Sequence, residues 1–98
     1  MVESEKYLEK KLSKAVEGRG GMSLKLPAIY FSGLPDRLIL IPASPAIFAE
    51  VKTTGEKPRK LQLVVHKLLQ RRGFKVYIID SSEAIKKLIE DVERKRLT

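Results

Sequence analysis

The positions of glycine and proline constrain the fold of this 98-residue chain most strongly, because they leave only short apolar segments between them. The breaks fall at 18–21, Pro27, 33–35, 42–45, 55–58 and Gly73. Glycine commonly ends helices, and proline can neither continue a helix nor donate to a sheet ladder. No apolar run approaches the roughly 20 residues of a membrane-spanning helix. We therefore expect a domain of short elements without a membrane partner.

Three segments have the periodicity of amphipathic helices. Residues 3–17 carry Leu8 and Leu12 at helical spacing. Residues 58–72 begin with a proline, which suits the first turn of a helix. The third helix follows a capping segment at 80–83 and ends in a charged tail at 94–96. We expect the second helix to turn an apolar stripe toward the core, formed by Leu61, Val64, Val65, Leu68 and Leu69.

The other apolar segments predict β-strands. Residues 22–30 look extended, while 37–41 and 46–52 predict the two strands of a hairpin. Residues 74–79 are apolar and β-branched, which is typical of a buried strand. The resulting order is α-β-β-β-α-β-α. It predicts a single mixed α/β domain over residues 1–98, in which a crossover helix adds a strand to a hairpin sheet.

The chain is strongly basic, with 20 lysines and arginines against 12 acidic residues and a net charge of +8. This balance favours a polyanionic partner, nucleic acid ahead of a membrane surface, although a basic balance can also serve solubility alone. The absence of cysteine excludes disulfides and thiolate zinc sites and fits a cytoplasmic protein. A domain this small also gains stability from a partner subunit.

Three charged residues interrupt the apolar hairpin: Asp36, Glu50 and Lys52. Alternation along a strand places Glu50 and Lys52 on one face and Val51 on the other. Asp36 begins the partner strand, at the same end of the hairpin as Glu50. Two carboxylates from different strands suit a hard cation such as Mg²⁺. A lysine on the same face is placed to orient water or to stabilise charge on a phosphate in the transition state.

The first two helices add a carboxylate and an amide to this group. Glu5 falls within about 40° of the centre of the apolar face of its helix, where a buried carboxylate needs a partner. Gln62, in the first turn of the second helix, flanks the apolar stripe and is expected to face the same site. Taken singly, a salt-bridged strand, a turn, the helix dipole or an exposed surface explains each residue. Their combination in this order favours a site. His66 is the only histidine, and we expect it to be structural.

The combined pattern resembles that of PD-(D/E)xK nucleases and, more narrowly, the virus-type replication-repair nuclease (VRR-NUC) domain. Nearly the whole chain takes part, from a helix glutamate and the Gly20-Gly21 pair through G-x-P-D-R-L at 33–38 and F-A-E-V-K at 48–52 to G-F-K-V-Y-I-I-D at 73–80. The resemblance implies a restriction-endonuclease-like core and a Mg²⁺- or Mn²⁺-dependent deoxyribonuclease. Small stand-alone members of phages and bacteria resemble Holliday junction resolvases. We therefore expect branched DNA or four-way junctions as substrate, a homodimer, and the cytoplasm of a bacterium or phage-infected host.

The resemblance also assigns roles to individual residues. Asp36 and Glu50 would be metal ligands, with the backbone carbonyl of Val51 as a further ligand, and Lys52 would be the catalytic lysine. Glu5 would match the helix glutamate at the metal, with Glu3 and Glu9 as open alternatives. Gln62 would match the helix glutamine of the catalytic group.

Basic residues around this group are expected to contact DNA phosphates, which position DNA without reading its sequence: Arg37, Lys57, Arg59 and Lys60. The alternative is a non-catalytic basic DNA-binding module that retains the nuclease fold. The presence of both Glu50 and Lys52 argues against that alternative. A basic protein-interaction domain explains the charge but not the carboxylates of the hairpin.

Overall fold

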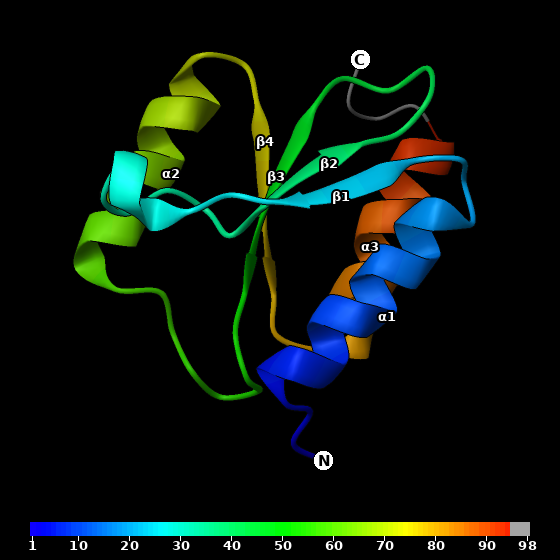
Figure 1. Cartoon of the computed structure of the whole chain (residues 1–98), viewed down its shortest axis with the longest axis horizontal. Helices are drawn as coiled ribbons and strands as arrows, with labels where there is room; N and C mark the ends of the chain where they lie inside the picture. Colours follow the sequence, from blue (N-terminus) through cyan, green and yellow to red (C-terminus); the bar gives the residue numbers. More distant parts are fainter. Residues whose placement is uncertain (95–98) are drawn as a thin grey trace.

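The computed structural model describes residues 1–94 and is built on a four-stranded mixed sheet (Figure 1). The first two strand pairs are antiparallel and the third is parallel. The predicted order α-β-β-β-α-β-α and the mixed α/β class are confirmed. The strands lie side by side in chain order: β1 (Met22–Lys25), β2 (Arg37–Leu40), β3 (Ile47–Val51) and β4 (Lys75–Ile79).

Within the described residues, three α-helices cover the two faces of the sheet (Figure 1). Helices α1 (Glu5–Glu17) and α3 (Ser82–Glu93) pack together on one face, and α2 (Lys60–Arg71) lies on the other. The main apolar core fills the space under α1 and α3, with the fully buried Leu8, Leu12 and Leu88 among its members. The buried residues of α2, which lies on the opposite face, are the polar Gln62 and His66 together with the apolar Val65.

Helix α3 begins as its sequence predicts. The hydroxyl of Ser81 accepts a hydrogen bond from the backbone N–H of Ala84 at 3.1 Å. The helix ends at Glu93 with Arg94 as its C-cap, and the predicted tail residues Lys95 and Arg96 lie outside the described residues. No helix within residues 1–94 has the length and the apolar character that a membrane crossing requires.

The extended segment predicted at 22–30 is corrected in its second half. Strand β1 ends at Lys25, and a 3₁₀ turn, η1 (Ala28–Tyr30), follows Pro27. Because proline cannot donate to a ladder, the strand stops before it. Helix α2 also begins later than predicted, at Lys60 rather than at Pro58.

The prediction for the apolar stripe of α2 is wrong in part. Leu61 and Val64 are 52% and 53% exposed, whereas the buried residues of α2 are Gln62, Val65 and His66. The physical reason lies in the sheet beneath the helix, which presents the buried carboxyl group of Glu50. A buried polar group must be hydrogen-bonded, so the helix turns its polar residues inward.

The loop before β2 approaches α2 closely at Gly33. This residue has a φ of +86°, and a Cβ atom there would lie 2.8 Å from the carbonyl oxygen of Leu61. Only glycine accepts both the left-handed backbone and this close approach without strain. The contact fixes the loop against α2 three residues before Asp36.

Candidate active site

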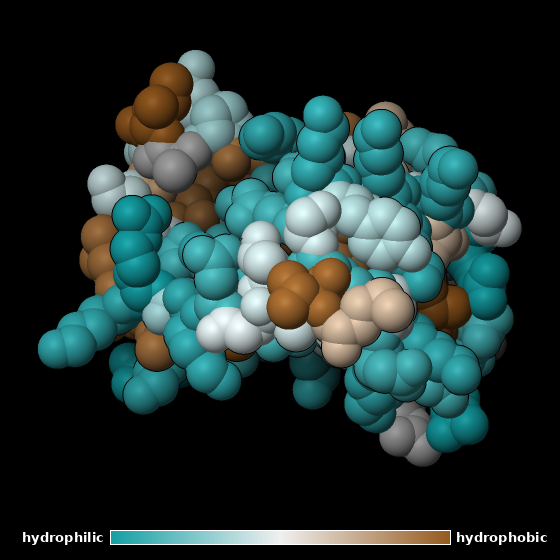
Figure 2. Space-filling view, turned by 90° about the horizontal axis from the view of Figure 1, so that it is seen from below, coloured by the Kyte–Doolittle hydropathy of each residue, from teal (hydrophilic) through white to brown (hydrophobic). Residues whose placement is uncertain are grey.

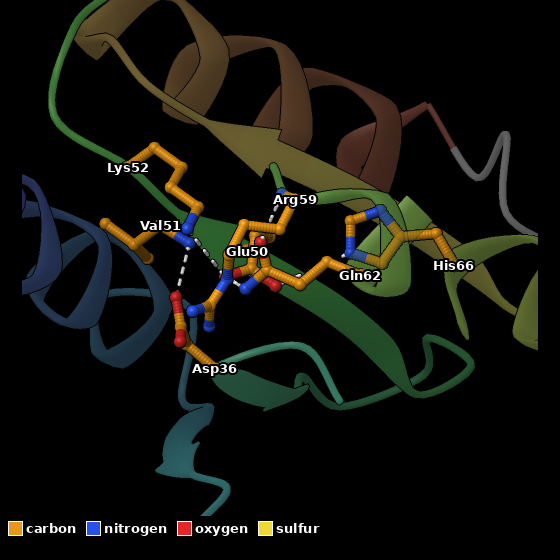
Figure 3. Close-up of polar contacts among 7 residues, drawn as sticks. All are labelled: Asp36, Glu50, Val51, Lys52, Arg59, Gln62 and His66. Atoms are coloured by element: carbon orange, nitrogen blue, oxygen red, sulfur yellow. Dashed lines mark hydrogen bonds and ion pairs between the residues drawn. The ribbon is translucent and has the colours of Figure 1, made fainter. Parts of the chain in front are cut away.

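The end of β3 is tied to the start of β2 by a side chain rather than by the sheet ladder. The β2–β3 register ends at the pair Arg37 and Ala49, so β3 continues beyond its neighbour. Beyond this pair, the side chain of Asp36 supplies the acceptor that a neighbouring strand would otherwise provide. Its Oδ2 accepts a hydrogen bond from the backbone N–H of Val51 at 2.8 Å (Figure 3). The Asp36 carboxylate is therefore held beside the last residues of β3.

Glu50 is buried between β3 and α2, with 1% of its surface exposed. Its Oε2 accepts a hydrogen bond from Nε2 of Gln62 at 3.0 Å, and its Oε1 lies 3.5 Å from Nε2 of His66 (Figure 3). The Gln62 amide cannot turn round, because its Oε1 accepts from the backbone N–H of Arg59 at 2.8 Å. The first turn of α2 thus orients the Glu50 carboxyl group.

Lys52 projects on the same side of β3 as Glu50, as the alternation of the strand predicts. Its Nζ lies 3.9 Å from Oε2 of Glu50, and its side chain is 17% exposed. The ammonium group therefore borders the buried carboxyl group and still reaches solvent.

The carboxyl groups of Asp36 and Glu50 are close enough to affect each other's charge. Burial, followed by the neighbouring Asp36 carboxylate, raises the pKa of Glu50 to about 8, while Lys52 acts in the opposite direction. Burial lowers the pKa of His66, so its imidazole is neutral at pH 7. Without added positive charge, Glu50 is therefore mostly protonated at neutral pH.

The carboxyl groups of Asp36 and Glu50 fit Mg²⁺ or Mn²⁺ better than a metal ion that takes all of its ligands from the protein. Within residues 1–94, no three or more histidine, cysteine, aspartate or glutamate side chains gather into a metal cluster. Mg²⁺ typically binds through one or two carboxylates and retains several waters. A divalent cation would also offset the mutual repulsion of Asp36 and Glu50, which disfavours ionisation of Glu50.

The three glutamates considered for the first helix have different partners. The carboxylate of Glu3 caps α3, where it accepts from the backbone N–H of Ser82 at 2.8 Å. Glu9 forms an ion pair with Arg37 at 2.7 Å. Glu5 is exposed, rather than buried as its place on the helix predicted, and desolvation, followed by the charge of Asp36, raises its pKa. Glu3 and Glu9 are therefore engaged by Ser82 and Arg37, which leaves Glu5 as the remaining candidate of the three.

The backbone at the start of α1 is anchored beside Lys52. Thr53 accepts a hydrogen bond from the N–H of Glu5 at 3.1 Å, and Thr54 accepts one from the N–H of Glu3 at 3.0 Å. These bonds tie the first helix to the loop after β3, although the two segments are far apart in the chain.

The predicted DNA-contact residues divide into two groups. Lys57, Arg59 and Lys60 are exposed around the start of α2, and the side chain of Arg59 extends toward Asp36 in Figure 3. Arg37 differs because its side chain is 15% exposed and its guanidinium group is paired with Glu9. The first three side chains are therefore accessible from solvent, whereas most of the Arg37 side chain is covered.

The contact between His66 and Glu50 was missed by the sequence analysis, which treated this histidine separately from the site. His66 follows Gln62 by four residues, and residues at this spacing lie on the same face of a helix. The sequence analysis expected Gln62 to face the site. Because His66 lies on the same side of the helix, that expectation also implied that His66 lies near Glu50.

The fold and the site together define a nuclease core of the restriction-endonuclease type: a mixed sheet with an aspartate and a Glu-x-Lys motif at one end. A solved structure described as a VRR_NUC domain superposes with a TM-score of 0.82 and 32% identity, over 90% of this chain and 97% of that chain. "Putative nuclease p44" of Acyrthosiphon pisum secondary endosymbiont phage 1 is 38% identical over 79 residues, which cover 81% of this chain and 85% of the phage protein. The chain matches no protein-family model. It belongs to the VRR-NUC family of nucleases, which confirms the resemblance found in the sequence.

Proposed function

We propose that this protein is a Mg²⁺- or Mn²⁺-dependent endonuclease that hydrolyses phosphodiester bonds in DNA. The observation that carries the proposal is the meeting of Asp36, Glu50 and Lys52 at one end of the sheet, with Glu50 buried. A structural salt bridge would not need a second carboxyl group beside the first. The phage origin of the relative supports action in the cytoplasm of a bacterium or an infected host.

The metal would be held by the carboxylates of Asp36 and Glu50, the backbone carbonyl of Val51, and Glu5 directly or through water. In a strand, the N–H and C=O of one residue point to the same side, as in a hydrogen-bonded antiparallel pair. Because the N–H of Val51 points to Asp36, its carbonyl faces the same side. When bound, the cation would supply positive charge beside the scissile phosphate and favour formation of the attacking hydroxide.

The protein's own groups would prepare the site around that ion. The Lys52 ammonium would orient the attacking water and stabilise negative charge that develops on the phosphate. Gln62 would keep the Glu50 carboxylate in a fixed orientation through its 3.0 Å hydrogen bond. Lys57, Arg59 and Lys60 would bind neighbouring phosphates and hold the DNA strand across the end of the sheet.

The substrate we propose is branched DNA, with four-way junctions foremost, cut by a homodimer. Hydrophobic side chains gather on the side of the molecule where α2 and η1 lie (Figure 2). Ile29, Phe31, Leu61 and Val64 are each more than half exposed there. Two-fold pairing through this face would bury it and supply two active sites for two strands.

The function is tested by incubating the protein with end-labelled four-way junctions, flaps and linear duplexes in Mg²⁺, in Mn²⁺ and in EDTA. We expect cuts in either metal and none in EDTA, with paired nicks on junction arms exceeding cuts in duplex. Tight binding without cleavage in either metal would instead establish the non-catalytic DNA-binding module. Equal cutting of all three substrates would overturn the proposed preference for branches.

Replacing Asp36 with asparagine is expected to weaken Mn²⁺ binding by at least about tenfold, because a metal ligand loses its charge. Titration calorimetry with Mn²⁺ measures this change directly. Asparagine keeps the oxygen that accepts from Val51, so the end of β3 should stay in place. Unchanged Mn²⁺ affinity would refute the assignment of Asp36 as a ligand.

Charged substitutions on the exposed apolar face should separate the dimer. Leu61→Glu combined with Val64→Glu is expected to convert the protein to a monomer in light scattering at micromolar concentration, because two carboxylates would be desolvated in each subunit. Leu63→Glu is the matched control, since Leu63 is also partly exposed on α2 but points away from Leu61 and Val64. A wild-type protein that is monomeric at all concentrations would contradict the dimer.

A further inference from the structure

The solvent-facing side of α1 carries a row of lysines that the candidate active site does not use. Lys6, Lys10 and Lys14 recur every fourth residue, so they lie on one side of the helix, and all three are exposed. Within residues 1–94, none of these three side chains has a hydrogen-bond or ion-pair partner. Lys11 differs, because its Nζ donates to the hydroxyl of Ser82 at 2.7 Å.

A hollow of about 800 Å³ lies along this row and is lined by Lys6, Lys10, Lys14, Ser13 and Arg37, among others. The one acidic side chain in its wall, Glu9, is neutralised by its 2.7 Å pair with Arg37. Positive charge therefore dominates the surface that lines the hollow.

The hollow approaches the candidate active site at two places, Arg37 and the start of α1. Arg37 follows Asp36 directly in the chain, and α1 begins with Glu5, whose backbone N–H donates to Thr53, the residue after Lys52, at 3.1 Å. The row of lysines therefore starts beside the site and leads away from it along α1. Hydrophilic side chains project over this side of the molecule in Figure 2.

We propose that Lys6, Lys10 and Lys14 form a second DNA-binding surface, which grips the backbone of the DNA segment that flanks the cleaved bond. This inference rests on the proposed nuclease function and adds a surface on the opposite side of the sheet from α2. Eight residues of α-helix span about 12 Å. One DNA strand has a phosphate about every 3.4 Å along the helix axis. The row is therefore long enough for each of its three lysines to contact a different phosphate, and lysine is suited to phosphates as a flexible point charge.

The experiment measures equilibrium binding to fluorescent four-way junctions and duplexes in EDTA, which separates binding from cleavage, over about 50 to 300 mM KCl. The test variant carries Lys6→Gln, Lys10→Gln and Lys14→Gln. The matched control removes the same charge from three exposed lysines elsewhere, with Lys67→Gln, Lys75→Gln and Lys86→Gln. Glutamine is a good helix former, so α1 should stay intact. Circular dichroism checks the fold of both variants.

We expect the slope of log K against log[KCl] to become shallower by about 2.7 in the test variant, because each released phosphate contact contributes about 0.9. The control variant should retain nearly the wild-type slope. If the triple variant does not fold, Lys10→Gln alone should reduce the slope by about 0.9.

Equal slopes in the test and control variants would overturn the inference, since bulk charge would then explain any loss of affinity. If this happened while the wild type still cut junctions with metal, the second surface alone would fail. A wild-type protein that neither binds nor cuts DNA would overturn the proposed nuclease function together with the inference.

Discussion

Replacing Lys52 with alanine is expected to reduce DNA cleavage by about 10²- to 10³-fold, the usual effect of losing one charge-stabilising group at a reaction centre. The Nζ atom lies 3.9 Å from the Glu50 carboxyl group and borders solvent, where a phosphate can reach it. The side chain contributes little to the core, so the thermal unfolding temperature should change little. Binding of a four-way junction in EDTA should stay within about threefold of wild type, because one exposed phosphate contact at most is lost.

The measurement is single-turnover cleavage of an end-labelled junction at saturating Mn²⁺. Saturation matters because the charge of Lys52 also lowers the pKa of Glu50, so the variant should need more metal for the same occupancy. Lys75→Ala is a control that removes an exposed lysine at the other end of β4 from Ile79. A variant that cuts within tenfold of the wild-type rate would exclude Lys52 from the chemistry.

Replacing Glu50 with glutamine should have opposite effects on stability and on metal binding. Burial raises the pKa of Glu50 from 4.5 to about 8, so the folded protein holds a proton that the unfolded chain releases. In EDTA, the free energy of unfolding therefore falls as the pH rises between these values, by up to about 1.4 kcal/mol per unit. Glutamine keeps the shape and can still accept from Gln62 but has no charge to bury. The variant should therefore be the more stable protein at pH 8 and lose Mn²⁺ binding.

Thermal unfolding of both proteins between pH 5 and 8.5 tests this prediction, in EDTA and in millimolar Mn²⁺. The lowered pKa of His66 works in the other direction below pH 6.5, so the range from 6.5 to 8 isolates Glu50 most clearly. Mn²⁺ should stabilise the wild type at high pH by mass action and leave the variant unchanged. A wild-type unfolding temperature that rises toward pH 8 in EDTA, with a parallel curve for the variant, would contradict the prediction.

The elements of the fold follow from local patterns in the chain. Apolar residues at helical spacing define α1 and α3, and Gly73 and Asp80 bound β4 within a residue of its observed limits. Alternation along β3 was sufficient to place Glu50 and Lys52 on one face, because the two-residue period of a strand holds in any surroundings. The Pro-Asp turn likewise placed Asp36 at the correct end of the hairpin. These features depend on neighbours along the chain.

The tertiary structure decided which side chains actually meet. The sequence favoured Glu5 and left Glu3 and Glu9 as alternatives, and the structure pairs Glu3 with Ser82 and Glu9 with Arg37. The apolar pattern of α2 predicted its inward face wrongly at Leu61 and Val64, because periodicity along the helix does not show that the sheet below contains a buried carboxyl group. Gln62 and His66 face the sheet because the buried carboxyl group of Glu50 must be hydrogen-bonded. This requirement outweighs the stability that burial of Leu61 would add. The sequence by itself therefore determined the helices, the strands and the motif of Asp36, Glu50 and Lys52. Contacts between distant parts of the chain decided which side chains these residues meet. The physical reason is that hydrogen bonding of a buried polar group outweighs the tendency of a helix to bury its apolar face.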